Sequence, residues 1–242
     1  MTRVRHIALA LATFAAGAQI SAGDASGLFS SHAALVAPGA SSSTPDGRVT
    51  VSVAWLDDDK SDGFPAVLRV RSGATVIEQR FDFGLNAEIV WSPGRTRFAL
   101  TGSHDGANGQ FRTAVVTVGT PRLGWFDVTP VIEAAVGHPA RCDWPEAPNV
   151  GAITWLSETR LLVAGEIINH SNCDSFGTFT AYEVDVARRR IERRHDQLDV
   201  KRRWPIELGS ELLQAPDACI TNPGSCRVRS RSEPQRRLEN LK

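Results

Sequence analysis

The stretches "EIVWSPGRTRFALTG" (88–102) and "GAITWLSETRLLVAG" (151–165) are two versions of one phrase, about 64 residues apart. In each, an apolar run ends in a tryptophan, Trp91 or Trp155, and a polar turn and an arginine follow. A short apolar strand closed by glycine completes the phrase. Pro-Gly in the first copy supplies a tight turn. The pattern predicts an antiparallel β-hairpin that the chain uses twice.

Further strands follow each copy. The segments "FRTAVVTV" (111–118) and "TFTAYEVDV" (178–186) alternate apolar with polar residues, as half-buried strands do. A last strand then closes each unit. An earlier, less similar unit precedes them over residues 49–83, with Gly73 in a hairpin turn. We therefore predict an all-β fold of about three antiparallel meanders, each with three or four strands.

The phrase over residues 89–118 resembles a blade of the bacterial TolB-like and WD40-like β-propellers, over about residues 50–195. The second copy keeps the tryptophan and the strand but lacks the Ser-Pro-Gly turn. The resemblance implies blade-like sheets and carries no chemistry. Closed propellers need about four blades or more, and this chain supplies three at most. We expect an open or incomplete propeller, in preference to one completed by a partner chain.

The N-terminus resembles an export signal. Arg3 and Arg5 precede an apolar run over residues 7–18, and small residues follow to position 26. That run is too short to span a bilayer, so we expect a periplasmic or secreted protein without a transmembrane segment. The expected divisions are a signal peptide (1–23), a flexible leader (24–47), a β-blade domain (48–213) and a tail (214–242).

Four cysteines in an exported chain predict two disulfides, for which three pairings exist. The cysteines are Cys142, Cys173, Cys219 and Cys226. "CITNPGSC" closes a short loop over a Pro-Gly turn, which favours pairing Cys219 with Cys226 and therefore Cys142 with Cys173. The tail is then expected to be tied by the small disulfide and to be disordered and basic beyond it. The spacing argues against a metal site, because no C-x-x-C motif is present.

Residues 129–150 form an insertion between two of the units. Its first part, "TPVIEAAVG", places Thr129 at an N-cap, proline in the first turn and glycine at the stop, which predicts one short helix.

Three polar loops hold the candidate site residues. "DDDKSDG" (57–63) contains Asp57 and Asp59 but lacks the glycine and the final glutamate of an EF-hand, so we interpret it as a solvated loop. A calcium site of another kind is the alternative, and no other cofactor is expected.

"GSHDG" (102–106) includes His104 and Asp105, but adjacent residues on extended backbone point to opposite faces and cannot form a catalytic triad. "HSNCDSFGTF" (170–179) includes His170 and Asp174 beside Cys173. An oxidised cysteine offers no thiolate nucleophile, so no catalytic residue is assigned here.

The C-terminal third is basic. Residues 187–242 hold 14 Lys and Arg against 8 Asp and Glu, whereas residues 24–186 hold 11 against 19. The arginines concentrated there are Arg188, Arg189, Arg190, Arg193, Arg194, Arg202 and Arg203. An anionic partner would be attracted to such a patch. Interleaved acidic residues favour a solvated edge that discourages aggregation, and a nucleic-acid partner is not expected.

The sequence leaves the function open among three hypotheses. The preferred one is an exported interaction module that presents the three loops on one face to an envelope protein or a peptide. The second is a hydrolase built from the His and Asp residues of those loops, which lacks a motif that fixes a nucleophile. The third is a structural envelope protein. We expect a binding role in preference to an enzymatic one.

Overall fold

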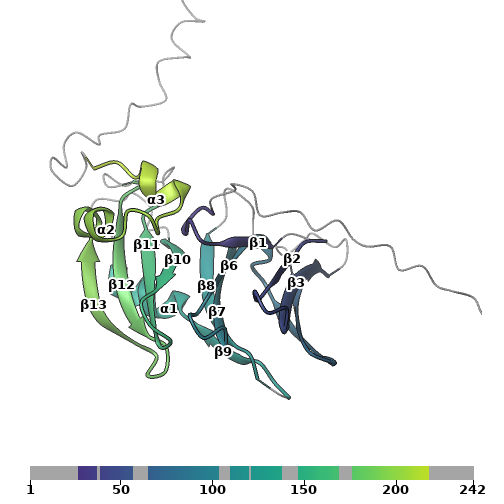
Figure 1. The fold of residues 1–242 in the computed structure, drawn as a ribbon. Helices are drawn as coiled ribbons and strands as arrows, with labels where there is room; N and C mark the ends of the chain where they lie inside the picture. Colours follow the sequence, from purple (N-terminus) through teal and green to yellow (C-terminus); the bar gives the residue numbers. More distant parts are fainter. Residues whose placement is uncertain are drawn as a thin grey trace, which may run out of the picture.

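A computed structural model (Figure 1) describes residues 27–36, 39–56, 65–103, 110–119, 121–137, 147–168 and 176–217. These residues form three antiparallel β-sheets and three helices, so the fold is mostly β as predicted. The Asp57 and Asp59 loop, His104, Asp105, His170, Asp174 and all four cysteines lie outside the described residues.

The first sheet has the order β2-β3-β4-β5. Its strands are β2 (Ser41–Ser43), β3 (Val49–Trp55), β4 (Ala66–Ser72) and β5 (Thr75–Phe81). The second sheet has the order β1-β6-β7-β8-β9. Its strands are β1 (Ala34–Val36), β6 (Leu85–Trp91), β7 (Arg97–Ser103), β8 (Phe111–Thr117) and β9 (Gly124–Asp127). Apart from β1, each sheet is a meander of sequential strands.

The third sheet has the order β10-β11-β12-β13. Its strands are β10 (Asn149–Trp155), β11 (Arg160–Glu166), β12 (Phe179–Asp185) and β13 (Arg190–Asp196). Helix α1 (Thr129–Val136) precedes this sheet, and α2 (Gln197–Arg203) and α3 (Ser210–Gln214) follow it. The chain therefore builds the sheets largely in sequence order.

The repeated phrase forms β6–β7 in the second sheet and β10–β11 in the third. Trp91 and Trp155 are 64 residues apart, whereas Arg97 and Arg160 are 63 residues apart, because the turn of the second copy is one residue shorter. A β-bulge between Ala152 and Thr154 absorbs the extra residue. Both tryptophans thus keep the same place in their hairpins.

The two tryptophans also make equivalent contacts with the preceding sheet. The indole N–H of Trp91 donates to Ser42 Oγ of β2 at 3.1 Å, and that of Trp155 donates to the carbonyl of Val90 in β6 at 2.9 Å. β2 and β6 each begin the meander of their sheets. The repeat therefore encodes one sheet-to-sheet contact twice.

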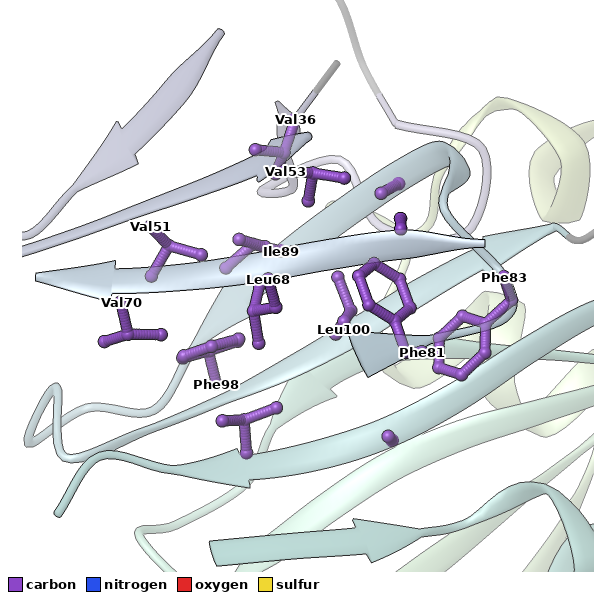
Figure 2. Packing of buried hydrophobic residues seen from close by; sticks show 14 of the residues in the cluster. Val36, Val51, Val53, Leu68, Val70, Phe81, Phe83, Ile89, Phe98 and Leu100 are labelled. Atoms are coloured by element: carbon purple, nitrogen blue, oxygen red, sulfur yellow. The ribbon is translucent and has the colours of Figure 1, made fainter. Parts of the chain in front are cut away.

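The three sheets stack face to face, and they lie side by side in Figure 1. One apolar cluster joins the first sheet to the second, and Figure 2 shows Val51, Leu68 and Phe81 facing Ile89 and Phe98 within it. A second cluster joins the second sheet to the third and includes Ile132 of α1. Burial of alternate residues on each strand supplies the stabilising apolar contact.

A second contact between these two sheets is polar and lies at the β-turns. The Glu158 carboxylate accepts hydrogen bonds from Ser92 Oγ (2.9 Å), the Gly94 N–H (2.7 Å) and Thr96 Oγ1. Desolvation is the largest single influence on the pKa of Glu158 and raises it. The hydrogen bonds together outweigh that effect, so the pKa lies below its ordinary value. The turn of the second copy of the phrase is therefore bound to the turn of the first.

The two ends of the stack are closed differently. The outer face of the first sheet carries polar residues such as Arg69, Arg71 and Glu78 on β4 and β5. The outer face of the third sheet is apolar over one half, where Leu162 and Ala181 pack against Val200, Leu208 and Leu212 of the α2–α3 region. Among the described residues, neither of these faces leaves a broad apolar surface for another sheet.

The N-terminal described segment, which we expected to belong to a flexible leader, is part of the fold. β1 and β2 lie within residues 24–47, and Phe29 and Val36 are each 1% exposed. The Leu28 and Phe29 N–H groups donate to Glu88 of β6, and the Phe29 ring occupies the space above Gly151 of β10. These contacts come from residues distant in sequence, which local composition does not reveal.

The predicted helix forms as α1, with Val128 rather than Thr129 as its N-cap, and Gly137 ends it with φ 66°. The expectation of one helix was incomplete, because α2 and α3 also form. The signal for α2 was Asp196, which caps the helix by accepting from the Asp199 N–H.

Candidate functional site

The described flanks of two of the predicted loops meet at one end of the stack. Gln110 and Phe111 follow the loop of His104, and Glu166 precedes the loop of His170. Asn149 connects these flanks, because its Oδ1 accepts from the Phe111 N–H (3.0 Å) and its Nδ2 donates to Glu166 Oε2 (3.1 Å). The loop of His104 therefore ends, and the loop of His170 begins, at neighbouring points of the second and third sheets.

Glu166 is a buried carboxyl at this end, with 1% exposure. Burial raises its pKa from 4.5 to about 8, opposed by the Asn149 amide and reinforced by the nearby carboxyl of Glu211, which hydrogen-bonds with it. A neutral carboxylic acid can donate a hydrogen bond from its O–H group to the second carboxylate. The pair thus holds α3 against β11 while Glu166 keeps its proton.

Glu88 is another buried carboxyl, again with 1% exposure. It lies opposite Thr101, as Gly151 lies opposite Ala164, so Glu88 and Gly151 are the same position in the two hairpins. Burial raises the pKa of Glu88 to about 7, although hydrogen bonds from the backbone N–H groups of Leu28, Phe29 and Ser30 oppose this rise. Glu88 and Gly151 both contact the N-terminal segment, and neither position is accessible to a ligand.

One concave feature among the described residues is a groove on the polar half of the third sheet's outer face, which we call the β13–α2 groove. It has a volume of about 480 Å³. Its lining consists of Leu156, Arg160, Glu183, Glu192, Arg193, Arg203 and Trp204. Three arginines and two glutamates, with little apolar surface, make this a site for polar or charged ligands.

Two acidic residues of the groove are already bound by basic side chains. Glu183 hydrogen-bonds to His195 Nε2 at 2.8 Å and contacts Arg160 at 3.4 Å. Glu192 lies 3.7 Å from Arg188 and 3.8 Å from Arg190. Arg193, in contrast, has no ion pair with any residue in the described part of the chain. The groove therefore presents an excess of positive charge.

His195 lies beneath the groove and is buried, with its ring edge against Trp204 at 5.0 Å between centroids. Its Nδ1 hydrogen-bonds to Asp199 Oδ2 at 2.9 Å, while its Nε2 bonds to Glu183. The bond from His195, followed by that from Arg202, lowers the pKa of Asp199 to about 2. Both ring nitrogens are occupied, so His195 fixes α2 on β12 and β13 and cannot act as a free general base.

The basic C-terminal patch is distributed over β13, α2 and the turn before β13. Most of its members are partnered: Arg188 with Asp185, Arg202 and Arg203 with Asp199. Arg189 lies over the Phe126 ring at 5.4 Å. Arg203 lies over the Trp204 ring at 4.6 Å, where a cation–π contact holds its guanidinium at the groove wall.

The sequence pointed to Arg193 and Arg203 as part of a basic stretch, but not to Glu183, His195 or Trp204. These residues come together only when β12, β13 and α2 pack. A partial signal was present in the Asp196–Asp199 spacing, which predicts a helix start directly after β13.

The described segments contain no group of three or more His, Cys, Asp or Glu arranged to hold a metal ion. None of the helices described here has the length and hydropathy needed to span a bilayer.

Comparison with known proteins gives limited likenesses. No protein-family model matches the chain, and no curated protein matches it. Among solved structures, the chain is similar to an acylaminoacyl peptidase of Pyrococcus horikoshii, with a TM-score of 0.41 and 10% identity over 68% of this chain. It is also similar to the AtxE2 isopeptidase, with a TM-score of 0.42 and 15% identity over 73% of this chain. The chain spans only 25% and 31% of those proteins.

Proposed function

We propose that this chain is an exported binding module that captures an acidic segment of a partner protein in the β13–α2 groove. The scaffold in this proposal is an incomplete propeller-like stack of three blades, and residues 1–23 serve as the export signal. The TolB-like and WD40-like resemblance of the repeated phrase supports the blade interpretation. The equivalent contacts of Trp91 and Trp155 support it as well.

The positive charge of the groove carries the proposal. Glu183 and Glu192 have basic partners, whereas Arg193 has none among the described residues, and Arg203 shares Asp199 with Arg202. A carboxylate that enters the groove can therefore accept from these guanidinium groups without displacing an existing ion pair of Arg193. Leu156 and Trp204 offer apolar contact beside it. Acidic side chains interspersed with apolar ones match that surface.

The hydrolase hypothesis gains nothing from the described residues. His195 is the buried histidine among them, and both of its ring nitrogens bind carboxylates. A catalytic constellation would have to come from the loops of His104 and His170. The third hypothesis, a structural envelope protein, predicts that the groove binds no ligand.

A direct test uses a fluorescein-labelled peptide of alternating glutamate and leucine, with fluorescence anisotropy as the readout. Arg193→Glu/Arg203→Glu should weaken binding by about 10- to 100-fold, because hydrogen bonds to charged groups contribute about 1.5–3 kcal/mol. Raised salt should weaken binding to the unmodified protein, because exposed charges are screened.

Arg48→Glu/Arg71→Glu is the matched control, because it makes the same charge change at two exposed sites, one directly before β3 and one on β4 of the first sheet. It should bind the peptide as the unmodified protein does. Equal affinity in the double variant and the control would overturn the proposal. Absence of binding to the unmodified protein would favour the structural hypothesis.

A further inference from the structure

The edge strands of the three sheets differ in how well they are protected from pairing with another chain. β1 and β2 have three residues each and β9 has four. β10 and β13 take part in ladders with a β-bulge, and β13 is rich in arginine. Short strands, bulges and charged side chains are the usual ways in which proteins prevent edge pairing. Five of the six edges are therefore short, bulged or rich in charge of one sign.

β5 is the sixth edge; it is neither short nor bulged, and its two charged residues, Glu78 and Arg80, have opposite signs. It has seven residues and pairs with β4 in an unbroken register from Thr75 opposite Ser72 to Phe81 opposite Ala66. No strand in the described part of the chain pairs with its other side. Its inward face is already closed, since Phe81 is 8% exposed and packs against Phe83 and Trp125. The strand therefore offers a regular backbone edge to a partner.

The direction of the open backbone groups follows from the hairpin. In an antiparallel ladder, alternate residues direct their N–H and C=O groups to the same neighbour. The β4–β5 turn has two residues, so Ser72 and Thr75 form a hydrogen-bonded pair next to it. Val76, Glu78 and Arg80 consequently direct their backbone groups to the open edge.

The charges on β5 are complementary to a second copy of the same strand. If two copies pair antiparallel about a twofold axis at Gln79, Glu78 lies opposite the partner subunit's Arg80, and Arg80 opposite the partner subunit's Glu78. Opposite charges at directly paired positions stabilise a sheet. An axis at Glu78 or at Arg80 would instead place like charges opposite each other. Glu78 and Arg80 are both exposed, and Glu78 would make the new contact beside its existing ion pair with Arg69.

We propose that two copies of this chain associate through β5, in an antiparallel pair centred on Gln79, which joins their first sheets into one continuous sheet. The interface is isologous, as a twofold dimer requires. It leaves the β13–α2 groove, on the third sheet, free in both copies, and it does not depend on the function proposed for that groove.

Exchange of the charges at Glu78 and Arg80 tests the pairing. The mass of the protein in solution is measured by light scattering during size-exclusion chromatography. In the Glu78→Arg variant, both cross-strand pairs of the dimer would consist of two arginines. This repulsion should weaken the dimer by about tenfold or more. Arg80→Glu places glutamates together and should have the same effect. The double variant Glu78→Arg/Arg80→Glu restores opposite charges in both pairs and should restore the dimer.

Cross-linking then tests the position of the axis. Gln79→Cys places the new cysteine opposite its own copy, so mild oxidation should give a covalent dimer on a non-reducing gel. Val76→Cys is the matched control: it lies opposite the partner subunit's Asp82 and should give no covalent dimer.

A chain that is monomeric at about 1 mM, where even a weak specific contact of about −4 kcal/mol would be populated, overturns the proposal. So does a dimer that both single charge variants leave unchanged, or one in which the double variant fails to recover. Cross-linking through Val76→Cys but not Gln79→Cys would place the contact in another register and overturn it too.

Discussion

Glu166→Gln should stabilise the protein at neutral and alkaline pH, against the common expectation that changing a buried polar residue destabilises a protein. The side chain is 1% exposed, and its pKa rises from 4.5 to about 8 on folding, first through desolvation. Between these two pH values the folded state holds a proton that the unfolded chain has released. The contribution of Glu166 to the free energy of unfolding therefore falls as the pH rises from 4.5 to 8, and it is constant above pH 8.

The magnitude follows from the size of the shift. One pKa unit corresponds to about 1.4 kcal/mol, so Glu166 costs about 3 kcal/mol of stability at pH 7 and about 5 kcal/mol above pH 8, relative to acid. Glutamine is neutral at every pH and has nearly the same shape. Its amide oxygen can still accept from Asn149, and its NH₂ group can donate to Glu211.

Glu88 contributes to the same fall over a narrower range, because its pKa rises from 4.5 to about 7. It should cost about 3 kcal/mol between those values. Of these two carboxyls, Glu166 accounts for most of the decline between pH 7 and 8, about 1 kcal/mol against about 0.3 kcal/mol for Glu88. Glu88→Gln is the matched control and should keep the decline between pH 7 and 8.

The assay is urea unfolding followed by tryptophan fluorescence at a series of pH values from 4 to 9. Glu166→Gln should match the unmodified protein near pH 4 and exceed it by about 3 kcal/mol at pH 7. If the two proteins lose stability equally between pH 7 and 8, Glu166 does not carry the proton and the argument fails.

Three further outcomes are expected. Gly151→Ala places a Cβ inside the Phe29 ring and should cost about 1–3 kcal/mol in urea unfolding through overpacking; an unchanged midpoint would mean that the ring does not occupy this space. Glu158→Ala removes three hydrogen bonds between the turns of the second and third sheets, at a partly exposed site, and should cost about 1 kcal/mol in the same measurement; no change would leave the turns uncoupled. The four cysteines should show no reactive thiol before reduction, and two labelled thiols would instead revive the hydrolase hypothesis.

The repeated phrase made the hairpins predictable because its signals are local. Alternation of apolar residues, a turn with Pro-Gly or polar residues and a closing glycine act within about fifteen residues. The short helix at α1 was predictable for the same reason. The candidate site was far less so: the predicted loops lie outside the described residues, and the groove was anticipated only through Arg193 and Arg203.

By itself, the sequence determined the strands from β3 to β13, their grouping into three sheets and the equivalent places of Trp91 and Trp155 in their hairpins. Only the tertiary structure decided what each copy of the hairpin does at Glu88 and Gly151, where one binds the N-terminal backbone and the other admits the Phe29 ring. The physical reason is distance along the chain. Strand periodicity is written in neighbouring residues, whereas the burial and partners of a side chain depend on segments that folding brings together.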